Sequence, residues 1–256
     1  MPAIAPDSLA TLAIIFVAAL AGAFVKGVTT MGLALIAVPI IALILDVQTA
    51  ILSLFLSKFL SDITMLYESK RELAWRSSFR LGPFIVAGLL AIPGATFLLA
   101  NAAGPWLYLV LGLSILIFVA YQLRPKAFII NAKHQGRWGV AFGAAAGATQ
   151  GLTGVGGPYT AMYLYSLGIG TNEFVFLSSV IYLLLDFSQL GAILYLDLYD
   201  RTRLGYAVLT IIPVMLGTWL GIRVRGRLNA AAFKRALLVL LTISGASLLV
   251  RAAVVA

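Results

Sequence analysis

Between residues 147 and 158 the chain reads GATQGLTGVGGP, a glycine-rich stretch that ends in a proline. Glycine adopts backbone conformations that other residues resist, and Pro158 has no backbone N–H to donate to a helix. The apolar runs on either side, at 138–152 and 157–168, are shorter than the roughly 20 helical residues that cross a bilayer. The stretch therefore predicts a break between two half-helices that meet in the middle of a membrane.

The composition of the whole chain also indicates a membrane protein. Hydrophobic residues make up 62% of the 256 residues and charged residues only 11%, whereas a soluble domain carries about 25% charged residues. The mean hydropathy is +1.04. The outer surface must therefore be apolar as well as the core, which predicts an all-α integral membrane protein in contact with lipid.

The basic residues indicate the orientation of the chain. The net charge of +9 comes from residues in short gaps between apolar runs, where they act as topology signals and contact lipid headgroups, so nucleic-acid binding is rejected. The positive-inside rule puts three of these gaps in the cytoplasm and both termini outside. The gaps contain Lys70, Arg71, Arg76 and Arg80; Arg124, Lys126, Lys133 and Arg137; and Arg223, Arg225, Arg227, Lys234 and Arg235.

The apolar runs form two sets in the same order of length. A shift of 124 residues aligns a Gly-x-Thr-x-x-Gly pattern at 27–32 with the same pattern at 151–156, and it places Asp62 on Asp186. Since the two sets enter the membrane from opposite sides, we expect two inverted repeats of about five segments each. The expected segments are 9–26, 30–45, 47–67, 79–100, 106–123, 138–152, 157–168, 174–196, 204–222 and 235–254.

This pattern divides the chain into a first transmembrane repeat (1–123), a cytoplasmic basic linker (124–137) and a second transmembrane repeat (138–256). In such a build the substrate site lies between the repeats, where discontinuous helices meet near the midplane. We expect glycine-rich broken helices or re-entrant hairpins near the midplane. Hairpins of half-helices and pairs of full spans both satisfy the orientation, so segments 1–2 and 6–7 can be either.

The two breaks have the chemistry of an anion site. Each exposes the N-terminus of a half-helix, with free N–H groups and a partial positive charge that together attract an oxyanion. Polar side chains at the breaks add a positive charge, hydroxyl donors and an amide. The alternative is that the glycines only allow helices to pack closely. The candidate substrate-binding residues at the breaks are Lys26, Thr29, Thr30, Gln150, Thr153, Gly154, Gly156 and Gly157.

Three further ionisable residues fall inside apolar segments. Lys58 and Asp62 are four residues apart and share a helical face, and Asp186 lies in the eighth segment. A charge at mid-membrane costs at least about 2.5–3.5 kcal/mol, so each needs a partner or a water-filled cavity. Lys58 is a candidate for binding the anion, and Asp62 or Asp186 for taking the proton that couples transport. The alternative for the first two is a structural ion pair, while Asp186 has no cation nearby in the sequence.

The run 147–158, with its weaker copy that ends at Pro39, resembles the sulfite exporter (TauE/SafE) family, also called the toluene sulfonate uptake permease family. Length, the basic central loop and the two-repeat layout agree over nearly the whole chain. The resemblance implies a bacterial or archaeal inner-membrane carrier of sulfite, or of an organosulfonate such as sulfoacetate, that exports its substrate with the proton gradient. Two features depart from the family. This chain has no cysteine, on which a thiosulfate-uptake branch relies, and its first break (29–33) has a less dense glycine run than many relatives have.

Functions other than that of a carrier are compatible with some of these features. An anion channel would use the same pore, and a small carboxylate would fit the same donors. An intramembrane enzyme is disfavoured because His134, the single histidine, lies in a polar loop. No metal site and no cofactor are predicted, since the ligand types are missing. The expected partners are a small anion, protons and membrane lipid, and small lipid-facing residues permit a homodimer without requiring one.

Overall fold

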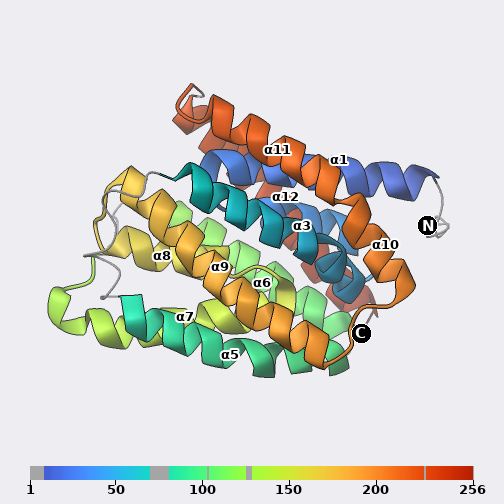
Figure 1. Cartoon of the computed structure of the whole chain (residues 1–256), viewed down its shortest axis with the longest axis horizontal. Coiled ribbons are helices and arrows are strands. Elements are labelled where there is room, and N and C mark those ends of the chain that lie inside the picture. Colours follow the sequence, from blue (N-terminus) through green and yellow to red (C-terminus); the bar gives the residue numbers. More distant parts are fainter. Residues whose placement is uncertain (1–8, 70–80, 103, 125–128, 228, 256) are drawn as a thin grey trace.

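The computed structural model describes residues 9–69, 81–102, 104–124, 129–227 and 229–255, and these contain helices and no strands. The helices run largely along the long axis of the molecule (Figure 1). The predicted basic cluster at 70–80, and Lys126, lie outside the described residues. The first half comprises α1 (Leu9–Thr29), α2 (Leu33–Ala42), α3 (Val47–Glu68), α5 (Gly82–Asn101) and α6 (Gly104–Gln122). The second half comprises α7 (Gln135–Thr153), α8 (Gly157–Ser166), α9 (Thr171–Tyr195), α10 (Arg201–Leu209), α11 (Ile211–Val224) and α12 (Ala230–Val255).

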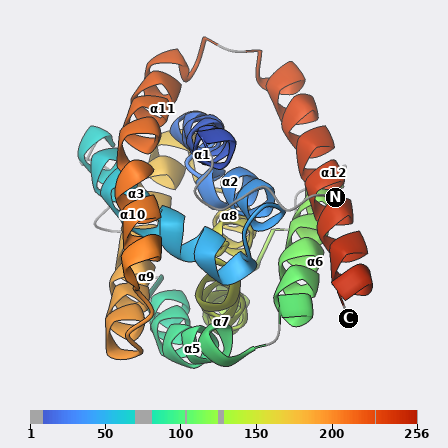
Figure 2. The ribbon, with the colours of Figure 1, turned by 90° about the vertical axis from the view of Figure 1, so that its right-hand side faces the viewer.

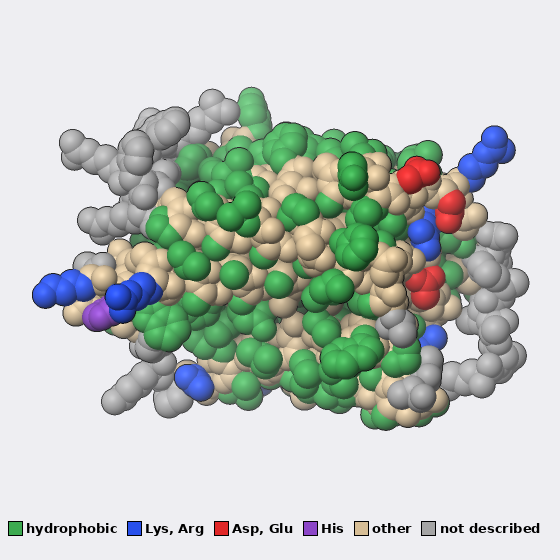
Figure 3. Space-filling view, turned by 90° about the horizontal axis from the view of Figure 1, so that it is seen from below, with side chains coloured by type: hydrophobic (Ala, Val, Ile, Leu, Met, Phe, Trp, Pro, Cys, Tyr) green, Lys and Arg blue, Asp and Glu red, His purple; other side chains and the backbone are tan. Residues whose placement is uncertain are grey.

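Most of these helices have the length and composition of membrane spans. Within the described residues, 7 stretches qualify: α1, α3, α5, α6, α9, α10 together with α11, and α12. Figure 3 shows hydrophobic side chains over the middle of one face and charged side chains at its two ends. The prediction of an all-α membrane protein is therefore confirmed.

The helix before the second break is longer than the sequence suggested. The segment expected at 138–152 is α7, whose 19 residues begin at Gln135 and end at Thr153. At 1.5 Å per residue it is about 28 Å long, so it is not a half-helix. The apolar run at 138–152 underestimates the length of α7 because the first turn of this helix is polar. By contrast α2 and α8 have 10 residues each. Each half therefore pairs one long helix with one short one.

Both breaks occur where the glycine pattern predicts them. Gly154 ends α7 in the left-handed conformation (φ 70°) and donates its N–H to the Gln150 carbonyl. At the first break Thr30 adopts the same conformation (φ 72°) and Gly32 has φ 142°. Thr30 and Gly154 are equivalent in the 124-residue shift, so the two breaks turn the chain in the same way although only one uses glycine at this position.

Helix pairs between the two halves pack through glycines. In α7, a Cβ on Gly143 would lie 2.1 Å from the Phe84 carbonyl oxygen of α5. In α11, a Cβ on Gly221 would lie 2.3 Å from the Phe24 carbonyl oxygen of α1. Backbones approach this closely only where the side chain is absent. Close packing therefore accounts for these glycines, whereas Gly32 and Gly154 serve the breaks.

The two short helices occupy the centre of the molecule. Viewed along the long axis, α2 and α8 lie inside a surround formed by the longer helices (Figure 2). Nearly every residue of α2 is buried, with Ile40 the exception. The helix N-termini that follow the breaks are thus held within the protein and away from lipid, as irregular backbone at membrane depth requires.

Candidate functional site

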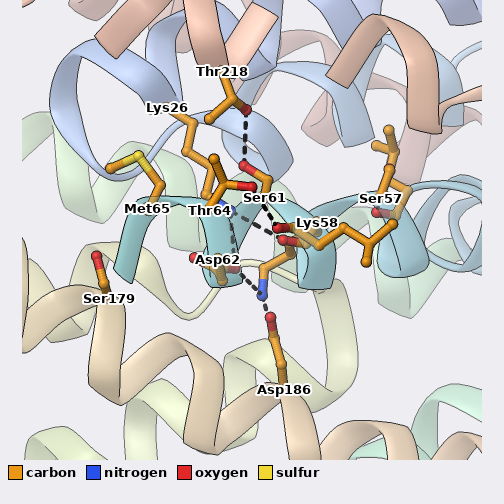
Figure 4. Close-up of polar contacts among 12 residues, drawn as sticks. Lys26, Ser57, Lys58, Ser61, Asp62, Thr64, Met65, Ser179, Asp186 and Thr218 are labelled. Carbon is orange, nitrogen blue, oxygen red and sulfur yellow. Dashed lines mark hydrogen bonds and ion pairs between the residues drawn. The ribbon is translucent and has the colours of Figure 1, made fainter. Parts of the chain in front are cut away.

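Lys26 in the last turn of α1 is buried beside a carboxylate of α3. Its Nζ forms an ion pair with Asp62 Oδ2 at 2.9 Å and donates a hydrogen bond to the Lys58 carbonyl oxygen at 3.2 Å. The lysine is only 3% exposed, so its charge depends on these partners. Nearby, a hydrogen bond of 2.8 Å connects the hydroxyl groups of Ser61 in α3 and Thr218 in α11 (Figure 4). The second half thus helps to fix the helix that carries Asp62.

Gln150 takes the corresponding place in the second half. It lies in the last turn of α7, and its Nε2 donates to Asp186 Oδ1 of α9 at 2.6 Å. Gln189 Nε2 in turn donates to the Gln150 carbonyl oxygen at 3.1 Å. The 124-residue shift maps Lys26 onto Gln150 and Asp62 onto Asp186, so a lysine–aspartate pair in one half matches a glutamine–aspartate pair in the other.

Lys58 joins the two halves of the site. Its Nζ contacts Asp186 Oδ1 directly and lies 3.7 Å from Asp62 Oδ2 (Figure 4). Asp186, which has no cation nearby in the sequence, thus has a cation partner in the fold. The partner comes from α3, 128 residues away, and no local spacing could reveal it. The alternative of a structural Lys58–Asp62 ion pair accounts only for the longer contact of Lys58, and not for its contact with Asp186.

The four charges cancel, yet several buried oxygens have no hydrogen-bond donor. Two lysines face two aspartates, so the cluster is neutral when all four groups are ionised. Asp62 Oδ1, Asp186 Oδ2 and Thr30 Oγ1 have no hydrogen-bond partner among the described residues, and the same holds for the side-chain oxygens of Gln150 and Gln189. Buried polar atoms are usually paired, so this concentration indicates a site for protons, water or a ligand.

Lys26, Lys58 and Asp62 border a small cavity of about 30 Å³, which we call the central cavity, and Thr30 and Gln150 line it too. Leu33 at the start of α2 and Gly157 at the start of α8 also line it. Neither helix N-terminus has a side-chain cap, so N–H groups without a side-chain partner lie at the border of the cavity with the lysines. Ammonium groups, amide N–H groups and carboxylates can together hold an oxyanion and exchange a proton.

The structure separates the candidate residues into two groups. The hydroxyls of Thr29 and Thr153 do not line the central cavity; they donate to the carbonyl oxygens of Val25 (2.9 Å) and Thr149 (2.6 Å). Gly156 packs against Gln150 instead, and Asp186 stands behind Lys58 and Gln150. The residues that do line the cavity are Lys26, Thr30, Lys58, Asp62, Gln150, Gly154 and Gly157.

Tyr182 is a polar lining residue that was not among the sequence candidates. Tyr182 of α9 is buried, lines the central cavity and holds its hydroxyl 3.4 Å from the Gly157 carbonyl oxygen. The 124-residue shift maps Lys58 onto Tyr182, so the repeat that relates Asp62 to Asp186 contained the signal. Tyr182 has a phenol where the equivalent Lys58 has an ammonium group. Both positively charged residues that line the cavity, Lys26 and Lys58, therefore come from the first half.

Comparison with known proteins gives one family match. The model of the family described as Sulfite exporter TauE/SafE matches residues 14–248, which include both breaks and all four residues of the charged cluster. No curated protein and no solved structure matches the chain.

Proposed function

The chain belongs to the TauE/SafE sulfite exporter family, a family of membrane transporters, and we propose that it is a proton-coupled secondary transporter that exports a small anion. The substrate is sulfite or an organosulfonate such as sulfoacetate. The observation that carries this proposal is the central cavity, where two buried lysines and two uncapped helix N-termini meet. Such an arrangement favours an oxyanion over a neutral or cationic solute.

Proton coupling follows from the charge balance of the cluster. An added monoanion would leave the neutral cluster with one uncompensated negative charge in a low-dielectric site. Protonation of Asp62 or Asp186 removes that charge and frees Lys26 or Lys58 to bind the anion. One proton is therefore expected to accompany each negative charge, with Lys58 as the residue that changes partner because it reaches both carboxylates.

We further propose an inverted repeat with substrate access from alternate sides. The pairing of α1 with α11 corresponds to that of α7 with α5, and the Lys26–Asp62 contact corresponds to Gln150–Asp186. Residues 1–123 form the first repeat, 124–137 the cytoplasmic linker and 138–256 the second repeat, in a bacterial or archaeal inner membrane with both termini outside. A homodimer remains a prediction.

Transport by purified protein in liposomes tests this proposal. Charge movement on a supported membrane, recorded at two pH values with sulfite, sulfoacetate and small carboxylates, should show a pH-dependent signal for a sulfur oxyanion. Lys58→Ala and Asp186→Asn should each remove the signal. Lys133→Ala and Asp197→Asn, which change exposed residues outside the cavity, are the matched controls and should leave it intact.

The alternative functions predict different results in these transport recordings. A flux far above carrier turnover and independent of pH indicates an anion channel, and a signal for carboxylates alone indicates a different substrate. Silence across the panel contradicts the proposed function. The small volume of the central cavity, about 30 Å³, favours the carrier over an open pore.

A further inference from the structure

A second, much larger cavity adjoins the central one. It measures about 680 Å³ and is bordered by the C-terminal ends of α1, α6 and α11 and by the first turns of α9 and α12. We call it the vestibule. Thr30, Met31 and Leu35 line both cavities, so the first break is the partition between them. The residues that line both cavities thus stand between the vestibule and the cavity that holds Lys26 and Lys58.

From this cavity we infer that the protein has a second anion site, in series with the central cavity, which holds an organic anion that has an apolar body. The inference rests on the proposed transport function. It adds that the substrate binds in the vestibule before it enters the central cavity, and that its anionic head and its apolar body are both recognised there. The vestibule would bind the anionic head near its basic residues and the body against its aromatic wall.

The charge of the vestibule suits an anion. Arg124, Arg225 and Lys234 line it, and no aspartate or glutamate appears among its described lining residues. The central cluster, by contrast, is neutral. An arriving anion therefore meets uncompensated positive charge first, which raises its local concentration before any proton is taken up.

The walls of the vestibule suit an apolar body. Phe118 of α6, Phe174 of α9 and Phe233 of α12 line it, together with Tyr121 and Tyr165. Ligand sites with mostly apolar walls and a few polar groups bind molecules that carry both kinds of surface. The central cavity of about 30 Å³ has room for only a few water molecules. An anion with a body thus needs the wider space beside it, which inorganic sulfite does not.

Arg225 connects the vestibule to the first break. Its Nε and Nη2 donate to the Gly27 carbonyl oxygen at 3.0 and 2.6 Å, one residue after Lys26. Arginine has five N–H donors, so donors remain for an anion. Because Arg225 also holds the end of α1, its replacement would disturb the fold. Lys234 and Arg124, which are exposed, are better positions for a test.

Binding of benzenesulfonate to protein in nanodiscs of neutral lipid, measured by calorimetry, tests the inference. Methanesulfonate, which has no ring, and benzyl alcohol, which has no charge, are the comparison probes. We expect benzenesulfonate to bind at least about tenfold more tightly than either, and the double variant Arg124→Gln/Lys234→Gln to weaken it about tenfold. Phe174→Ala should weaken benzenesulfonate more than methanesulfonate. Arg235→Gln, a neighbour of Lys234 that does not line the vestibule, is the matched control.

Equal affinity for the two sulfonates, or affinity unchanged in the double variant and in Phe174→Ala, overturns the inference. Loss of binding in nanodiscs of anionic lipid also overturns it, since a lipid headgroup would then be the natural occupant. The central site is tested separately with Lys58→Met/Asp186→Asn, which should retain vestibule binding but not transport. If the unmodified protein transports the anion but does not bind benzenesulfonate in the vestibule, only this inference is contradicted. If it binds benzenesulfonate in the vestibule but transports no anion, only the proposed function is contradicted.

Discussion

Lys58 is the residue that reaches both carboxylates of the charged cluster. It contacts Asp186 and lies 3.7 Å from Asp62, while Lys26 reaches only Asp62. Removing one partner of a buried ion pair leaves a charge without compensation and typically costs about 3–5 kcal/mol, whereas removing both partners costs much less. The cluster therefore makes a prediction about stability that does not depend on knowing the substrate.

Lys58→Met should lower the free energy of unfolding by about 3 kcal/mol, because Asp186 is left buried without its cation. Adding Asp186→Asn should restore most of that loss, since the remaining groups are again neutral as a set. Thermal unfolding in detergent, followed for the two single variants and the double variant, measures the coupling. Additive effects of the two substitutions would mean that the two side chains do not act as a pair, and Lys133→Met in an exposed loop provides the control.

Thr30 carries a second prediction at this scale. It adopts φ 72°, where a Cβ costs roughly 1–2 kcal/mol, and its buried Oγ1 has no hydrogen-bond partner among the described residues. Thr30→Gly should therefore raise the unfolding temperature, as the equivalent Gly154 suggests. A residue kept in a strained conformation at a cavity indicates function, so the same variant should bind the transported anion less tightly. A lower unfolding temperature would contradict the strain argument. Thr153→Gly, at the last residue of α7 where φ is not positive, should be destabilising.

Sequence reasoning identified the residues of the cavity better than their partners. Lys26, Lys58, Asp62 and Asp186 could be predicted because charges in apolar segments are conspicuous. The Lys58–Asp186 contact could not, because it depends on how α3 and α9 meet across the two halves. The hydroxyls of Thr29 and Thr153 were expected to face the cavity, but hydroxyls near a helix end readily bond to carbonyls of the preceding turn.

Among the elements, α7 shows how composition can mislead about length. Its polar first turn hid the helix start, so 138–152 was predicted in place of Gln135–Thr153. The predicted segments match the helices to within five residues, with the largest difference at the start of α12 and one interruption at Thr210 between α10 and α11. Hydrophobic runs thus located the helices, and only tertiary packing decided which face each presents and how α7 lies against α5.

The contact between α5 and α7 gives the prediction at the element scale. Gly143→Ala would put a Cβ 2.1 Å from the Phe84 carbonyl oxygen, so the helices must separate and the free energy of unfolding should fall by about 1–3 kcal/mol. Gly136→Ala is the matched control, because nothing lies within 4 Å of its Cβ in the same helix. It should be neutral or stabilising by up to about 1 kcal/mol. Chemical unfolding in micelles compares the two, and equal effects would contradict close packing at Gly143.

For the whole molecule, the distribution of charge suggests how the protein sits in the membrane. The start of α1, the end of α12 and α10 lie toward one end of the long axis, and the start of α7 lies toward the other (Figure 1). The vestibule opens among helix ends that carry Arg124, Arg225 and Lys234, which belong to the gaps assigned to the cytoplasm by the positive-inside rule. An exporter with this orientation would meet its substrate at the vestibule first.

Because the chain has no cysteine, a single introduced thiol reports the orientation without background. Arg201→Cys at the start of α10 and His134→Cys before α7 change exposed residues at opposite ends. In intact cells a membrane-impermeant maleimide should label only Arg201→Cys, and after permeabilisation it should label both. Labelling of His134→Cys alone would reverse the orientation and make the vestibule an outward-facing site, so that the same cavity would serve uptake. Labelling of both in intact cells would mean that the chain inserts in both orientations, and the basic gaps would then not determine its topology.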